Sequence, residues 1–124
     1  MLGSSTATSL IGTAKPEIAK AFYRDTLGLK LASEDQFAAV FETKNLKIRL
    51  STTPAVAPAP YAVLAFNVAD VEAVVDALGA KGVAFARYPF LVQDAKGVWT
   101  GPDGVRVAWF HDPDLNLLSV VQAP

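Results

Sequence analysis

The sequence predicts an α+β protein built from two copies of one unit, a strand followed by a helix and three strands. The same order of strand-like and helix-like segments occurs before and after a proline-rich stretch, residues 52–60. The two expected helices also end alike, in DTLGLK at residues 25–30 and DALGAK at residues 76–81. The chain closes with two apolar segments around residues 112–116, DPDLN, which indicate a hairpin inside a sheet covered on both sides. Together these features indicate an internal repeat.

The first unit spans residues 5–51 and begins with a threonine-rich apolar segment, 6–11, expected as a strand. A helix is expected next, because Pro16 suits a first helical turn, where a missing N–H group costs nothing. Apolar residues then recur at helical spacing up to Gly28, which stands where helices commonly end in a left-handed conformation. The three strands that complete the unit are expected at residues 29–33, 37–42 and 46–51.

The second unit spans residues 61–124 and follows residues 52–60, whose three prolines and lack of periodicity predict a stiff connector. It begins with an expected strand at 61–68 and a helix capped by Asp70. The apolar stripe of this helix consists of Val71, Val74, Val75 and Leu78. A strand kinked at Pro89, a glycine-rich loop and the hairpin strands complete the unit, at residues 83–92, 94–104, 105–110 and 117–121.

Length and composition exclude several classes of protein. The 124 residues are expected to form one domain, 1–124. Eleven basic and twelve acidic residues nearly balance, which argues against a nucleic-acid partner. No apolar run has the length of a membrane span and no secretory signal is visible, so a cytoplasmic protein without a membrane partner is expected. The chain has no cysteine and one histidine, His111, which excludes thiolate chemistry and a histidine-rich metal site within one chain.

Three motifs along the chain resemble those of one family. They are AFYRDTLGL at residues 21–29, AFNVAD at residues 65–70 and DPDLN at residues 112–116. In this order the chain resembles the vicinal oxygen chelate superfamily, which contains glyoxalase I, the bleomycin-resistance proteins and the extradiol dioxygenases. The resemblance implies two tandem βαβββ modules forming a curved mixed sheet, with helices on the convex side and a concave ligand cup. It also implies a homodimer, because family members commonly pair and often complete the cup with the partner chain.

The hairpin turn departs from the family pattern at Leu115, where the family has glycine. This position favours a left-handed backbone, which glycine adopts freely and a residue with a Cβ atom does not. The sequence therefore predicts a turn that is strained or of another type, while the fold itself is not in question.

The family's enzymes hold a divalent metal with four His or Glu side chains, one from each of four strands that line the cup. Carried over to this sequence, the four positions are Thr8, Arg49, Val63 and Ser119. Arg49 is a cation that would repel a metal, Val63 has no lone pair, and a lone hydroxyl is a poor ligand. No carboxylate or imidazole stands next to any of the four. The resemblance therefore implies a member with no metal site and no cofactor.

Strand alternation decides which side chains share the cup with these positions. The resemblance implies that Trp109 lies where glyoxalases place an aromatic ring against the substrate, and alternation puts Val107 and His111 on its side. The residues expected in the core under the helices are Ile48, Leu50, Leu118 and Val120. The residues expected to bind the ligand are Thr8, Arg49, Tyr61, Val63, Asn67, Val107, Trp109 and Ser119. They give an apolar cup with one aromatic plate and few polar groups, which suits a small, partly aromatic ligand.

Several of these residues have a second interpretation. Trp109 could fill a shallow cup or a dimer contact instead of stacking on a ligand. Arg49 could be a solvated charge that discourages pairing of strand edges. His111 could be an exposed or locally bonded histidine; a role as general base stays open, although no residue near it in the sequence would orient it. Trp99 lies in a glycine-rich loop and could be a lid or could pack outside the sheet.

The sequence leaves three functions open. The first is a metal-independent small-molecule binding protein of the glyoxalase/bleomycin-resistance type, sequestering an apolar or anionic aromatic ligand as in antibiotic resistance. Bleomycin itself fits poorly, because it is cationic like Arg49 and Lys47. The second is a glyoxalase-like lyase, isomerase or dioxygenase, for which His111 is the one proton carrier near neutral pH. The third is a degenerate dimeric interaction module. We expect the first, and the sequence identifies no catalytic residue.

Overall fold

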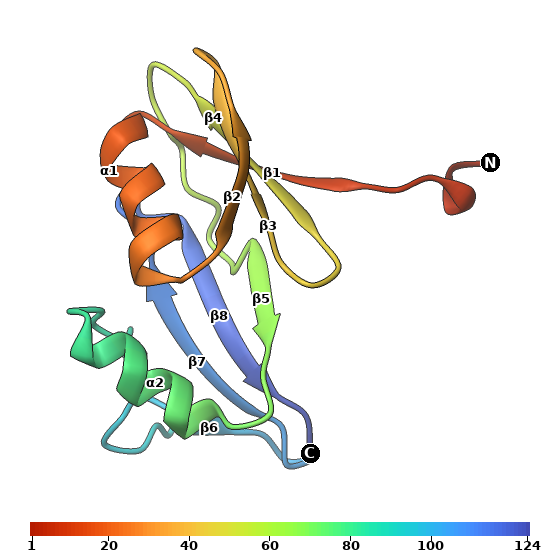
Figure 1. Ribbon diagram of the computed structural model, residues 1–124. Helices are drawn as coiled ribbons and strands as arrows, with labels where there is room; N and C mark the ends of the chain where they lie inside the picture. The colour runs from red at the N-terminus through yellow and green to blue at the C-terminus, as the bar shows by residue number, and fades with distance from the viewer. The chain divides into compact units, whose positions relative to one another are not determined.

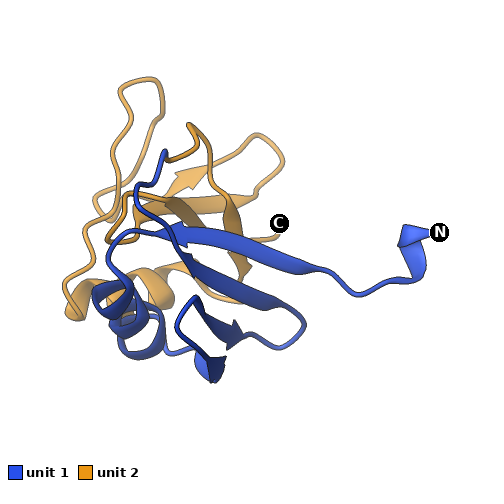
Figure 2. Ribbon diagram, turned by 90° about the horizontal axis from the view of Figure 1, so that it is seen from above, with its two compact units in different colours: residues 1–57 blue, residues 58–124 orange.

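The computed structural model describes residues 1–124 and divides into two compact units, residues 1–57 and 58–124 (Figure 2). Each unit holds one four-stranded sheet and one α-helix (Figure 1). Along the chain each unit has a strand, a helix and three further strands, so the predicted α+β fold with tandem βαβββ modules is confirmed. None of the helices combines the length and apolar character that crossing a membrane requires.

The first unit orders its strands β1-β4-β3-β2, with β1 parallel to β4 and the other neighbours antiparallel. The strands are β1 (Thr8–Thr13), β2 (Lys30–Glu34), β3 (Ala38–Glu42) and β4 (Lys47–Thr52). Helix α1 (Pro16–Ala21) begins at the expected proline and continues as a π-helical segment, Phe22–Thr26. Gly28 then leaves the helix with a φ of 73°, in the left-handed region, as predicted. Before β1, an extended segment leads to a 3-10 turn, Leu2–Ser4 (Figure 1).

The core of the first unit lies between α1 and one face of its sheet. Ile48 and Leu50 of β4 are buried there, as strand alternation predicts. Tyr23 from the π-helical segment is fully buried and packs on Phe41 of β3, with ring centroids 5.8 Å apart. The intervening residues of β4, including Arg49, point to the opposite face.

The second unit orders its strands β5-β8-β7-β6, with β5 parallel to β8 and the other neighbours antiparallel. The strands are β5 (Leu64–Asn67), β6 (Trp99–Thr100), β7 (Arg106–His111) and β8 (Leu117–Gln122). Helix α2 (Val71–Ala80) begins at its predicted cap, where the Asp70 carboxylate accepts the Ala73 N–H at 3.2 Å. Its buried stripe covers the buried Leu118 and Val120 of β8.

The strand predicted at residues 83–92 is absent, and that prediction was wrong. Only Phe85 of this segment forms a β-bridge, with Phe110. The first of the three strands after α2 is instead β6, within the stretch predicted as a glycine-rich loop, 94–104. The strand expected at 61–68 is also shorter, because regular pairing begins only at Leu64.

Gln93 provides the physical reason for the missing strand. Its side-chain carbonyl accepts the Tyr88 N–H at 2.8 Å, and its amide donates to the carbonyls of Ala86 and Gly97 at 2.9 Å each. These bonds satisfy backbone groups that a strand would pair with its neighbours. Pro89 removes one further donor from the segment. Residues 83–92 therefore form a loop whose backbone is held by a side chain.

The turn between β7 and β8 is organised by Asp112, which is buried. Its carboxylate accepts the N–H groups of Asp114 at 2.9 Å and Asn116 at 3.0 Å, and the Asn116 side-chain amide at 2.9 Å. The same turn forces Leu115 to a φ of 68°, and no other non-glycine residue of the chain has a positive φ. This is the strain that the sequence predicts at Leu115. A left-handed residue with a Cβ atom costs roughly 1–2 kcal/mol.

We expect Leu115→Gly to stabilise the protein by about 0.5–1 kcal/mol, because glycine removes the strain but loses more entropy on folding. Leu115 is 64% exposed, so little burial is lost. Leu115→Ala is the matched control: it removes the same side chain but keeps the Cβ atom, and it should give no gain. Chemical unfolding of the three proteins measures the difference. Equal stability of the glycine and alanine variants would show that the turn is not strained.

Candidate functional site

One face of the second unit's sheet carries no Asp, Glu, Lys or Arg side chain on its strands. The register places Trp109 opposite Ser119 and places Val107 opposite both Val121 and Trp99. Residues in register on neighbouring strands point to the same side of a sheet. The face therefore includes Trp99, Val107, Trp109, His111, Leu117, Ser119 and Val121. On β5 it continues with Ala65 and Asn67, which pair with Ser119 and Val121. We call it the aromatic face.

The aromatic face exists because the other face of the same strands is taken up by the core. Ala108 and Phe110 of β7 and Leu118 of β8 are fully buried, and Val120 is nearly so. Alternation then leaves the two tryptophans on the opposite side, where each is half-buried. Large aromatic rings in this position keep apolar surface accessible after folding, and this surface is available for contact with another molecule.

Trp109 is the centre of the aromatic face. Its ring lies 6.2 Å from that of Trp99 at an interplanar angle of 41°, and 5.7 Å from that of Tyr88 in an edge-to-face arrangement of 89°. Trp99 thus lies beside Trp109 on one face of the sheet. Tyr88 belongs to the segment that sequence reasoning assigned to a strand, so its part in this face was missed.

Gly101 fixes the position of the Trp99 ring. A Cβ atom at this position would lie 2.9 Å from Val105 Cγ1, which is too close for that atom to stay in place, and 3.0 Å from Trp99 Cη2, so that the ring would have to move by a few tenths of an ångström. The loop is closed by the Gly101 N–H, which donates to the Val105 carbonyl at 2.7 Å. The ring of Trp99 therefore packs directly against the backbone of Gly101, which has no side chain to keep the ring away.

The structure places several residues predicted to bind the ligand on this face. Val107 and Ser119 are buried, and the Ser119 hydroxyl donates to the Leu64 carbonyl at 3.3 Å. Asn67 is exposed on β5. Val63 lies just before β5 and is 36% exposed, and its N–H donates to the Leu117 carbonyl at 2.9 Å.

Three further predicted residues lie outside the strands of the aromatic face. Tyr61 precedes β5 and is 64% exposed. Thr8 and Arg49 belong to the first unit, where Thr8 pairs with Lys47 and Arg49 pairs with Val40 on the face away from its core. Arg49 is half-buried, and none of the chain's ion pairs includes it. That these residues bind a ligand together with Trp109 stays a prediction.

The resemblance implies four positions for the family's metal ligands, two in each unit, and none of these side chains by itself suits a divalent cation. Val63 offers no lone pair, and Arg49 brings a positive charge to its own position. The Ser119 hydroxyl is engaged with a backbone carbonyl, and Thr8 contributes a neutral hydroxyl on an edge strand. No three His, Cys, Asp or Glu side chains of the chain are grouped so that they could hold a metal ion.

His111 lies at the end of β7 and its side chain is exposed. It pairs with Leu117, so it belongs to the side of the sheet that carries Trp109. No hydrogen bond or ion pair fixes the imidazole. A general base needs a neighbour that orients it toward a substrate proton, and His111 has none in the structure.

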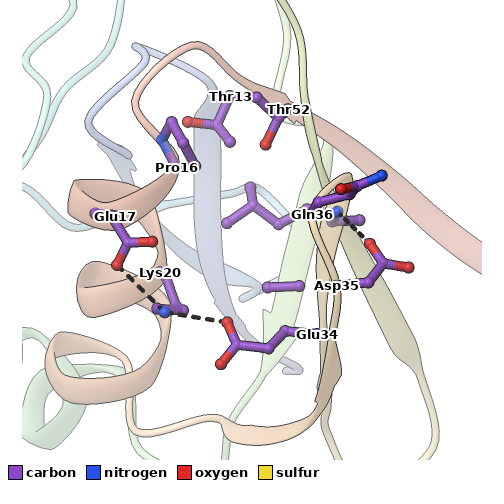
Figure 3. A pocket seen from close by; sticks show the side chains of 11 residues that line it. Thr13, Pro16, Glu17, Lys20, Glu34, Asp35, Gln36 and Thr52 are labelled. Atoms are coloured by element: carbon purple, nitrogen blue, oxygen red, sulfur yellow. Dashed lines mark hydrogen bonds and ion pairs between the residues drawn. The ribbon is translucent and has the colours of Figure 1, made fainter.

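A groove in the first unit, of about 190 Å³, lies between α1 and the sheet (Figure 3). At its centre, Lys20 Nζ lies 3.2 Å from a Glu17 carboxylate oxygen and 3.0 Å from one of Glu34. These two carboxylates, Glu34 first, raise the pKa of the Lys20 ammonium above its ordinary value. Sequence reasoning did not single out this groove, because the only signal was a polar turn between two strands.

The other charged group of the groove, Asp35, closes the turn between β2 and β3. Its carboxylate accepts the N–H groups of Phe37 at 2.8 Å and Ala38 at 3.0 Å. These two bonds hold the pKa of Asp35 below its ordinary value. Every charged side chain that lines the groove thus has a partner inside the unit, unlike the uncharged rings of the aromatic face.

The two βαβββ units define a small α+β protein, and the second unit carries the aromatic face. The family model of the Glyoxalase/Bleomycin resistance protein/Dioxygenase superfamily matches residues 7–119. The chain belongs to this superfamily, and the predicted family resemblance is confirmed.

Solved structures show the same fold. Lactoylglutathione lyase from Agrobacterium tumefaciens is 17% identical, with a TM-score of 0.76, and the match covers 96% of this chain and 93% of that chain. A putative glyoxalase family protein from Bacillus anthracis is 19% identical, with a TM-score of 0.76 and coverage of 98% and 96%. A glyoxalase/bleomycin resistance protein from Catenulispora acidiphila is 22% identical, with a TM-score of 0.72 and coverage of 98% and 100%. None of the curated proteins matches the chain.

We expect Gly101→Ala to displace the Trp99 ring and to destabilise the protein by about 1–3 kcal/mol through overpacking. Gly79→Ala is the matched control: nothing lies within 4 Å of a Cβ atom there, and alanine in a helix should stabilise by about 0.5–1 kcal/mol. Chemical unfolding gives the stabilities, and the NMR shift of the Trp99 indole N–H reports the ring. An unmoved Trp99 resonance in Gly101→Ala would contradict this account of the ring's position.

Proposed function

We propose that the chain is a small-molecule binding protein that holds an apolar or anionic aromatic ligand against Trp109 without a metal ion. The observation that carries the proposal is the aromatic face itself. Its strands present two half-exposed tryptophans in contact with each other and no Asp, Glu, Lys or Arg side chain. Such a surface binds a flat, apolar molecule with the most favourable free energy, because ring stacking and burial of apolar area act together.

The few polar groups of the face support a role in ligand binding, because they can fix the orientation of a bound molecule. Asn67 offers both donors and acceptors at the exposed end of β5, while the Ser119 hydroxyl is already engaged. A few polar groups on an apolar surface are typical of small-molecule sites, where they set the orientation of the ligand. Arg49 of the first unit belongs to none of the chain's ion pairs, and its positive charge is the reason to include anionic compounds among the candidates.

The chemistry of the donor positions supports binding without a metal. In the first unit these positions bring a cation, Arg49, and a hydroxyl, Thr8, and in the second an aliphatic chain, Val63, and a hydroxyl, Ser119. None of these side chains is a ligand that divalent metals favour. The unoriented His111 gives an enzymatic role little support, since no second group prepares it for proton transfer. The homodimer implied by the family resemblance is part of the proposal, and its molar mass in solution tests it.

A thermal-unfolding screen tests the proposed class of ligand. Nickel, zinc and manganese ions form one arm, and small aromatic acids and neutral aromatic compounds form the other. A ligand present at one hundred times its Kd stabilises the native state by about 2.7 kcal/mol, so its binding raises the Tm by several degrees. A rise with organic compounds alone supports the proposal. A rise with metal ions alone contradicts binding without a metal.

We expect Trp109→Ala to weaken the binding of the best compound from the screen by roughly tenfold or more, because it removes the central ring. Trp109→Phe keeps a ring at this position and should recover part of the affinity. His111→Ala should leave the affinity unchanged, since the imidazole has no part in the proposed contact. Titration calorimetry of the four proteins measures these Kd values, and normal affinity in Trp109→Ala would place the ligand elsewhere.

A further inference from the structure

Four aromatic side chains of the second unit form a continuous run that extends beyond the sheet. Trp109 contacts both Trp99, at 6.2 Å, and Tyr88, at 5.7 Å, measured between ring centroids. Tyr88 in turn contacts Phe90 at 5.4 Å. We call these four residues the aromatic run. A ligand with one ring can cover only a part of it.

The outer end of the aromatic run is exposed to solvent. Phe90 is 78% exposed, whereas Tyr88 and both tryptophans are half-buried. A single exposed phenylalanine on a protein surface needs no explanation. Phe90 differs because it continues an apolar surface whose other members are already in ring contact with one another.

The loop that carries Tyr88 and Phe90 is braced before any ligand arrives. The three side-chain hydrogen bonds of Gln93 hold its backbone, including the Tyr88 N–H. The Leu91 N–H closes a turn on the Tyr88 carbonyl at 3.1 Å. A backbone held in this way loses little conformational entropy on binding, which favours a binding surface over a loose hydrophobic loop.

The charges of the surrounding segments are engaged elsewhere. The Arg87 guanidinium donates to the carbonyls of Asp94 and Ala95 within its own loop. Arg106 pairs with Glu72 at 2.9 Å, and Lys96 pairs with Asp76 at 2.9 Å. The aromatic run therefore presents rings without free charge, and the part of a ligand that lies along it is itself uncharged.

We propose that the ligand is an extended molecule with at least two fused or linked aromatic rings, which lies along the aromatic run from Trp109 to Phe90. This inference rests on the proposed function and adds the shape of the ligand to it. Trp109 binds the first ring, and Tyr88 and Phe90 bind the part of the molecule that a single-ring compound lacks. Phe90 is then a residue that determines specificity for length.

The test compares three aromatic acids that share one carboxylate and differ in ring number: benzoate, 2-naphthoate and anthracene-2-carboxylate. Titration calorimetry gives the Kd of each with the unaltered protein and with three variants. Phe90→Ala should weaken anthracene-2-carboxylate by about three- to tenfold, the loss of one aromatic contact, and leave benzoate unchanged. Trp109→Ala should weaken all three acids, because every ligand uses the central ring.

Phe37→Ala is the matched control, because Phe37 is a similarly exposed phenylalanine, 62% accessible, in the first unit. It should change none of the three affinities. The exposure of Phe90 means that Phe90→Ala removes no core packing, and an unfolding midpoint equal to that of the unaltered protein verifies this.

The outcomes separate this inference from the function on which it rests. If Trp109→Ala weakens all three acids but Phe90→Ala changes none or all of them equally, the extended ligand is overturned and the proposed function stands. If Phe90→Ala changes only the molar mass of the protein in solution, the ring serves contact between copies of the chain, and the inference is likewise overturned. If the unaltered protein binds none of the acids, both proposals fail.

Discussion

The buried carboxylate of Asp112 is the constraint on which the second unit depends. By holding the N–H groups of Asp114 and Asn116, it closes the hairpin of β7 and β8 in one register. Since β8 also pairs with β5, this register positions most of the sheet. A slip by one residue would exchange every side chain between the two faces and bury Trp109 in place of Phe110. The aromatic face thus depends on the hydrogen bonds that Asp112 accepts in one turn.

The two units share one plan but present different chemistry on the face away from the core. In the first unit β4 places Lys47 and Arg49 there, and β3 adds Glu42 opposite Lys47. In the second unit the corresponding strand, β8, places Leu117 and Ser119 there. Both units therefore keep the buried alternation that folding requires, whereas the faces free of that requirement differ: one carries charged side chains and the other carries two tryptophans.

The sequence correctly predicted the features that depend on periodicity or on the chemistry of single residues. Both helices, the Asp70 cap, the buried Ile48 and Leu50 and the strained Leu115 follow from spacing or from one residue's backbone preference. The prediction for residues 83–92 was wrong because their apolar pattern is typical of a strand. The side chain of Gln93, which follows this segment, forms the hydrogen bonds with its backbone that a neighbouring strand would otherwise form. With that segment misassigned, Tyr88 and Phe90 could not be placed beside Trp109. Pro89 was the one visible sign of irregularity.

The contact between Trp99 and Trp109 has a consequence for optical spectroscopy. The chain has two tryptophans, and both lie on the same face of the second unit. The intrinsic tryptophan emission of the protein therefore originates from a single neighbourhood, whereas the peptide circular dichroism arises from both units. Denaturation curves recorded by the two signals will coincide only when the units lose their structure together. Tryptophan fluorescence therefore reports on the unfolding of the second unit alone.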